Sequence, residues 1–253
     1  MPSVIRLLLA CLACLPAAGA QGARLSIAAA ADLKFAMADL IATFQKNHPA
    51  DAVEASYGSS GVFTAQIRQG APFDLFFSAD SSYPSRLVQE GMAASAVQPY
   101  ATGRLVLWGA RRDASRMTLA DLTDPSIERI AIANPKHAPY GRCAVEVLRN
   151  AGLWPKVQEK LVYGENIAQT AQLVATGNAT VGLIALSLAR HPKIARQGSY
   201  LLIPENLHTP LVQGFIITRH GKDNPLAQSF ATFMESAAAH EILQDHGFML
   251  PTR

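Results

Sequence analysis

Short hydrophobic runs alternate with amphipathic segments along most of the chain. The hydrophobic runs have the length of buried strands, whereas the amphipathic segments repeat their hydrophobic residues every three or four positions, as one face of a helix does. This order of elements predicts parallel sheets covered by helices on both faces. The segment 33–47 shows the helical repeat, with one face formed by Leu33, Met37, Leu40, Ile41 and Phe44.

The pattern predicts an α/β fold without an internal repeat or a low-complexity segment. We expect strands at 25–29, 53–57, 75–78, 104–108, 130–133, 161–163, 181–184, 200–203 and 212–218. We expect helices at 33–47, 62–69, 83–90, 140–151, 167–176, 226–236 and 238–246. Gly70 and Gly91 follow two of these helices, and glycine is a common residue at helix ends.

Two segments, 100–103 and 210–214, are candidate crossings between two lobes. A chain that leaves one lobe, builds a second and returns needs two such crossings. The expected division is a first lobe formed by 24–99 together with 213–253, and a second lobe formed by 100–212.

The first twenty residues have the pattern of a secretion signal. A basic start at Arg6 precedes an apolar run, 7–16, that is too short to span a bilayer as a membrane anchor. Ala18-Gly19-Ala20 then matches a small-x-small cleavage site. A lipoprotein is the alternative, because Leu8-Leu9-Ala10-Cys11 resembles a lipobox, but the apolar stretch before that cysteine is unusually short. We therefore expect a signal peptide at 1–20 and export of the mature chain.

The composition is that of a folded protein with a core, since 49% of the residues are hydrophobic and 16% are charged. The formal net charge is +3, and it is not gathered into runs. Arg111 and Arg112 are the densest basic spot of the mature region, and no aromatic residues interleave with basic ones. A nucleic-acid partner is therefore not expected.

No catalytic motif is visible in the sequence. The histidines form neither an HExxH pair nor a zinc-binding spacing with cysteine, and Gly58-Ser59-Ser60-Gly61 lacks the lysine of a P-loop. Cys143, the one cysteine of the mature chain, is interpreted as a small apolar residue on a helix face, and His137 as a solvated loop residue. The sequence favours a binding protein without a cofactor. An enzyme that uses His137, Cys143 or Asp32 is the alternative from another class.

Three junctions between a strand and the next helix have suggestive chemistry. They are Ala29-Ala30-Ala31-Asp32-Leu33, Tyr57-Gly58-Ser59-Ser60-Gly61 and Pro139-Tyr140-Gly141. In parallel sheets ligands collect at such ends, where the first amides of a helix are free. None of the three contains lysine or arginine, so they suit an anion held by hydrogen bonds and helix dipoles. The alternative is that Asp32, Ser59 and Ser60 are ordinary helix caps.

Several segments, in this order and spacing, resemble the periplasmic molybdate-binding proteins of molybdate ABC transporters, which belong to the type II periplasmic-binding-protein superfamily. The resemblance covers nearly the whole mature chain, and its most specific part is GAPFDLFFSAD at 70–80. The matching segments are 28–33, 57–61, 66–80, 134–141 and 247–248.

The resemblance implies a two-lobed α/β fold, each lobe a mostly parallel sheet flanked by helices, with the ligand in the cleft. It implies a monomeric periplasmic protein that binds molybdate or tungstate without a cofactor or a direct bond from protein to metal, and that hands the oxyanion to a membrane permease. The ligand residues implied are Ala31 or Asp32, the Ser60 hydroxyl, and the backbone amides of Tyr140 and Ile167. Ser59, Leu33 and Gly61 are further candidates. Ala185 stands where some members place a tyrosine hydroxyl on the ligand.

Asp32 departs from the resemblance, because that position is commonly Ser, Thr or Asn in these proteins. A carboxylate should repel a dianion. Asp32 could turn away and cap its own helix, which we favour, or be protonated and donate, or the ligand could be another oxyanion. A protonated oxyanion is therefore the runner-up ligand, and a sensing or scaffold role for the cleft is a third hypothesis.

Overall fold

The computed structural model describes residues 22–251. The predicted signal peptide, 1–20, and the candidate lipobox lie outside the described residues. No helix in the described part of the chain is long and apolar enough to cross a membrane.

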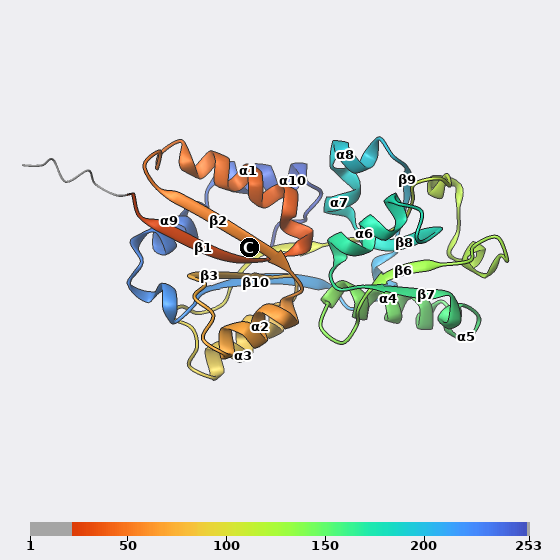
Figure 1. Cartoon of the computed structure of the whole chain (residues 1–253), viewed down its shortest axis with the longest axis horizontal. Coiled ribbons are helices and arrows are strands. Elements are labelled where there is room, and N and C mark those ends of the chain that lie inside the picture. The colour runs from red at the N-terminus through yellow and green to blue at the C-terminus, as the bar shows by residue number, and fades with distance from the viewer. Residues whose placement is uncertain (1–21, 252–253) are drawn as a thin grey trace, which may run out of the picture.

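The first of two sheets contains five strands in the order β2-β1-β3-β10-β4. Strands β1 (Arg24–Ala30), β2 (Ala52–Gly58) and β3 (Leu75–Ser78) pair in parallel, whereas β10 (Leu211–Ile217) runs antiparallel to β3 and to β4 (Gln98–Gly103). Helices cover both faces (Figure 1). One face packs against α1 (Lys34–Gln45), α9 (Pro225–Phe233) and α10 (Ala237–Asp245), and the other against α2 (Ser60–Arg68) and α3 (Ser82–Gln89). We call this sheet with its helices the first lobe.

The second sheet also contains five strands, in the order β7-β6-β8-β5-β9. Strand β6 (Ile130–Ala133) pairs in parallel with β7 (Leu161–Gly164) and β8 (Val181–Ala185), whereas β5 (Leu105–Gly109) is antiparallel to β8 and to β9 (Ser199–Leu202). We call this sheet with its helices the second lobe. Its helices are α4 (Pro139–Asn150), α5 (Trp154–Val157), α6 (Ile167–Ala175), α7 (Leu186–Arg190) and α8 (Pro192–Ala195).

Short 3-10 helices complete the described elements. The first, η1 (Ala31–Leu33), joins β1 to α1 and brings Asp32 to the junction between the lobes. The others are η2 (Ala114–Arg116), η3 (Leu119–Thr123), η4 (Gln158–Lys160), η5 (Glu205–Leu207) and η6 (His220–Asp223).

The prediction of a two-lobed α/β fold with mostly parallel sheets is confirmed, and in each described sheet one strand runs against the others: β10 in the first lobe and β5 in the second. The reason lies in the crossings: β4 leads into β5 through Arg104, and the chain returns from β9 to β10. A strand that enters a sheet from the other lobe can run antiparallel to its neighbours. The predicted division at 99/100 and 212/213 falls inside β4 and β10, and it stays a prediction.

Candidate functional site

A small cavity lies between the two lobes, with about 200 Å³ of space including its opening. The first lobe supplies residues that follow β1, β2 and β3, and the second lobe supplies the beginnings of α4 and α6. The lining residues are Ala30, Ala31, Asp32, Gly58, Ser59, Ser60, Ala79, Ala138, Pro139, Tyr140 and Ile167. None of them is a lysine or an arginine.

Three helices begin at this cavity: α2 at Ser60, α4 at Pro139 and α6 at Ile167. The first amides of a helix have no partner within it, and the helix dipole places partial positive charge there. The amides of Ser60, Tyr140 and Ile167 donate to no residue outside their own helices in the part of the chain that the structure describes. The cavity is therefore lined by free donors from both lobes.

The Ser60 hydroxyl is oriented by the backbone of the first lobe. The amide of Ala79 donates to Ser60 Oγ at 3.0 Å, and the serine is fully buried. A hydroxyl that accepts one hydrogen bond still has its own hydrogen to donate. This hydrogen is available to an acceptor in the cavity.

Asp32 is 1% exposed and is held by residues from both lobes. Its Oδ2 accepts hydrogen bonds from Gln213 Nε2 at 2.6 Å and from the Tyr140 hydroxyl at 3.0 Å. Burial raises the pKa of the Asp32 carboxyl from 3.8 to about 6, although the hydrogen bonds from Gln213 and Tyr140 and the nearby backbone amides of Asp32 and Leu33 lower it. The favoured prediction that Asp32 caps its own helix is wrong, because neither η1 nor α1 has a side-chain capping bond and the carboxyl turns to Tyr140 and Gln213 instead.

Contacts across the cleft hold the two lobes together around the cavity. Ser59 Oγ lies 2.8 Å from His137 Nδ1, and the amide of Gly61 donates to the His137 carbonyl at 2.9 Å. The Ser187 hydroxyl donates to the Asp32 carbonyl at 2.8 Å. The interpretation of His137 as a solvated loop residue is therefore wrong, because its ring is mostly buried against the first lobe.

Most of the residues that line the cavity were predicted from the sequence, but the polar residue that contacts Asp32 from behind the cavity was not. Ala31, Asp32 and Ser60 line the cavity with Tyr140, Ile167 and Ser59, whereas Leu33 is in the first-lobe core and Gly61 contacts His137. Gln213 was not predicted. The feature that could have indicated it is a polar residue inside the otherwise apolar strand β10, where it is fully buried.

The other residues considered for catalysis form no paired site. Burial raises the pKa of the Cys143 thiol to about 12, so the thiol stays protonated, as expected for a small apolar residue on α4. Ala185 does not line the cavity. Among the described residues, no group of three or more His, Cys, Asp or Glu could hold a metal ion.

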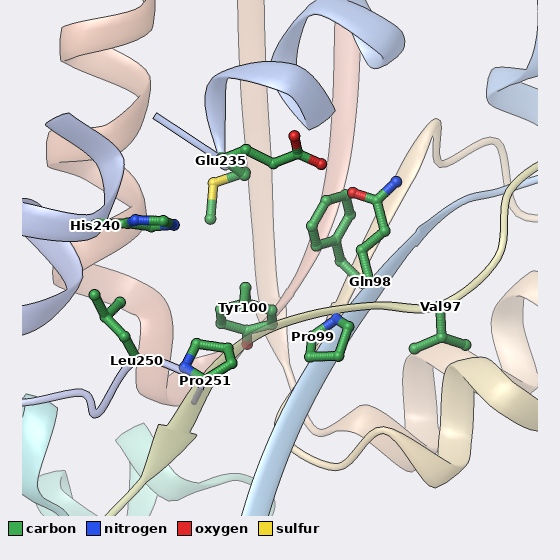
Figure 2. A pocket seen from close by; sticks show the side chains of 10 residues that line it. Val97, Gln98, Pro99, Tyr100, Glu235, His240, Leu250 and Pro251 are labelled. Carbon is green, nitrogen blue, oxygen red and sulfur yellow. The ribbon is translucent and has the colours of Figure 1, made fainter. Parts of the chain in front are cut away.

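A larger cavity, with about 1030 Å³ of space including its opening, lies in the first lobe, away from the predicted residues. Figure 2 shows Tyr100 in its wall, with Leu250 and Pro251 on one side and Pro99 on the other. Tyr100 links this wall to the site between the lobes, because its hydroxyl donates to Gln213 Oε1 at 2.5 Å. The chemistry predicted from the sequence belongs to the smaller cavity.

The family model of bacterial extracellular solute-binding proteins matches residues 25–249. The chain belongs to this family. Among relatives, it is 39% identical over 249 residues to the molybdate-binding protein ModA of Azotobacter vinelandii, covering 98% of each chain. It is 38% identical over 200 residues to ModA of Rhodobacter capsulatus, covering 78% of this chain and 77% of that one.

A solved structure agrees with the family assignment. The periplasmic molybdate-binding protein of Azotobacter vinelandii superposes with a TM-score of 0.85 at 33% identity, over 90% of this chain and all of that one. These relatives are binding proteins by name. The cavity of this solute-binding protein lies between its two lobes, where a solute can contact helices from both.

Proposed function

We propose that this solute-binding protein captures molybdate or tungstate between its lobes and delivers it to the membrane permease of an ABC transporter. One observation supports the proposal above the others: three helix N-termini and the Ser60 hydroxyl meet at a cavity whose lining has no lysine or arginine. Such a site binds a dianion by hydrogen bonds and dipoles. The ModA relatives support the identity of the anion.

The proposed ligand residues are Ser60 through its hydroxyl and amide, and Tyr140 and Ile167 through their amides. Ala31, Asp32 and Ser59 complete the first-lobe side. A hydrogen bond to a charged group is worth roughly 1.5–3 kcal/mol. Four or five such bonds supply enough free energy for tight binding after the costs of association are met.

The proposal includes export. We expect cleavage after Ala20 and a monomer that works in the periplasm, with the first lobe at 24–99 plus 213–253 and the second at 100–212. Mass spectrometry of the mature protein tests the cleavage, since a lipid-modified cysteine would instead indicate a lipoprotein. Light scattering of the same sample tests the monomer.

Titration calorimetry on the purified mature protein tests the ligand. Molybdate and tungstate should bind tightly and with similar affinity, while the smaller sulfate should bind weakly because it cannot reach donors from both lobes together. Phosphate tests the runner-up, because a protonated oxyanion needs an acceptor and Asp32 Oδ1 has no partner among the described residues. Absence of heat with both molybdate and tungstate would refute the proposal.

A further inference from the structure

Only one of the two carboxyl oxygens of Asp32 has partners. Oδ2 accepts from Tyr140 and Gln213, whereas Oδ1 is buried without a hydrogen-bond partner among the described residues. An ionised oxygen buried without a donor is costly. A carboxylic acid that has its hydrogen on Oδ1 needs only an acceptor there. An oxyanion in the cavity supplies this acceptor, because Asp32 lies in the cavity wall.

Within the described chain, no buried cation offsets the charge of Asp32. Tyr140 on α4 and Tyr100 on β4 face the carboxyl, and both stay neutral because burial and Asp32 raise the pKa of each hydroxyl well above its usual value. Helix α6 and strand β10 contain no titratable residue. Strand β2 also contributes Tyr57, whose pKa burial raises. The charged residues of the neighbouring α1, α7 and β2 are exposed: Lys34, Asp39, Arg190 and Glu54.

An ionised Asp32 would repel a dianion strongly, because like charges inside a protein are screened less than in water. We propose that Asp32 binds the oxyanion as a neutral carboxylic acid, with Oδ2 accepting from Tyr140 and Gln213 and Oδ1 donating its hydrogen to a ligand oxygen. This inference rests on the proposed function. Asp32 takes this proton from the solvent before the lobes close. The binding of each dianion is therefore accompanied by the uptake of one proton by the protein.

The pKa of Asp32 is shifted upward, as this role requires. Burial between the closed lobes brings it to about 6, and a bound dianion raises it further. Above pH 6 the free protein is mostly ionised at Asp32 while the complex stays protonated. Proton linkage then weakens binding by about tenfold for each pH unit above 6, until the pKa of the complex is reached.

The test measures molybdate affinity from pH 6.5 to 8.5, where molybdate itself stays a dianion. The wild-type protein should lose roughly a hundredfold in affinity over these two pH units. Calorimetry at pH 7.5 in two buffers of different ionisation enthalpy should show uptake of about one proton per molybdate bound. This second measurement needs no variant.

Asp32→Asn imitates the neutral acid, because its amide donates on one side and its carbonyl accepts from Tyr140 and Gln213 on the other. Its affinity should not vary with pH in this range, and at pH 8.5 it should exceed that of the wild type by tens of fold. Asp223→Asn, at an exposed carboxylate far from the cavity, is the matched control and should keep the wild-type slope.

His137 is a further titratable group at the cleft, where its ring contacts the Ser59 hydroxyl, so His137→Gln is measured alongside. A pH slope that persists in Asp32→Asn but disappears in His137→Gln would overturn the inference. A wild-type affinity that is constant with pH, without proton uptake, would overturn it too and leave the proposed function intact. No molybdate binding at any pH would instead refute the proposed function itself.

Discussion

Ser60 combines a structural contact with a free donor at the cavity. Its oxygen accepts from the Ala79 amide, and its hydrogen remains available for a ligand. We predict that Ser60→Ala weakens molybdate binding by tenfold or more, because one hydrogen bond to a charged oxygen is worth roughly 1.5–3 kcal/mol. The variant should also lose about 1 kcal/mol of stability, since the Ala79 amide loses its acceptor. Calorimetry and thermal unfolding measure the two effects.

Ser56→Ala is the matched control for this prediction. Ser56 lies on β2, the strand that leads to Ser60, and its side chain is exposed. Its removal should change neither affinity nor stability. If Ser60→Ala lowered stability but kept the wild-type affinity, the hydroxyl would serve Ala79 alone.

At the residue scale, the sequence shows which residues reach the cavity but not where their side chains point. Ser60, Tyr140 and Asp32 follow strand ends, so the pattern places them at the edge where ligands collect. The orientation of Asp32 depends on Tyr140 and Gln213, which are 108 and 181 positions away in the chain. Contacts this distant leave no periodic signal, so the capping prediction relied on local preference and was wrong.

Helix α2 begins where the two lobes come closest, and Gly61 in its first turn makes this approach possible. A Cβ atom at Gly61 would lie 2.8–2.9 Å from the backbone of His137, which is closer than atoms pack. We predict that Gly61→Ala weakens molybdate binding because the lobes cannot close fully. Alanine is a better helix former than glycine, by roughly 1 kcal/mol, so the ligand-free protein should be no less stable. Calorimetry with thermal unfolding tests both expectations.

Val62→Ala provides the control on the same helix, since Val62 is exposed and does not line the cavity. It should bind molybdate as the wild type does. Wild-type affinity in Gly61→Ala as well would show that the lobes tolerate the added methyl group, and that this contact does not limit closure.

At the scale of elements, the long helices and most strands were predictable, whereas the shortest helices and strand β4 were not. Helices such as α1 and α4 span several turns, so their hydrophobic period is visible. Helices α5 and α8 have four residues each, too few to show a period. Edge strand β4 mixes polar and apolar residues, so only the structure separates it from β5. The antiparallel strands β5 and β10 were both predicted, and each enters its sheet from the other lobe.

The whole molecule encloses its cavity because the cores of the lobes meet. Ala30, Ala31 and Ala79 of the first lobe belong to the same buried cluster as the second-lobe core. Small side chains at these strand ends let the lobes approach while leaving space for a ligand. Two series of alternating strands and helices permitted two lobes, and the resemblance to molybdate-binding proteins implied the cleft between them. The contacts that hold the cleft closed join distant residues and required the structure.

One of these contacts lies at the rim of the cleft, where Arg142 of α4 bridges the lobes. Its guanidinium pairs with Asp80 and donates to the Tyr83 hydroxyl at 2.9 Å, both in the first lobe. The pair is partly exposed, so solvent screening limits its contribution to about 1 kcal/mol or less. We predict that Arg142→Gln speeds molybdate release by up to about fivefold while leaving the association rate nearly unchanged, because the pair forms only when the lobes close. Stopped-flow fluorescence measures both rates.

Arg68→Gln is the matched control. It removes a comparable pair with Glu90 that lies wholly within the first lobe, and it should release molybdate at the wild-type rate. Equal release rates in the two variants would show that Arg142 does not hold the lobes together.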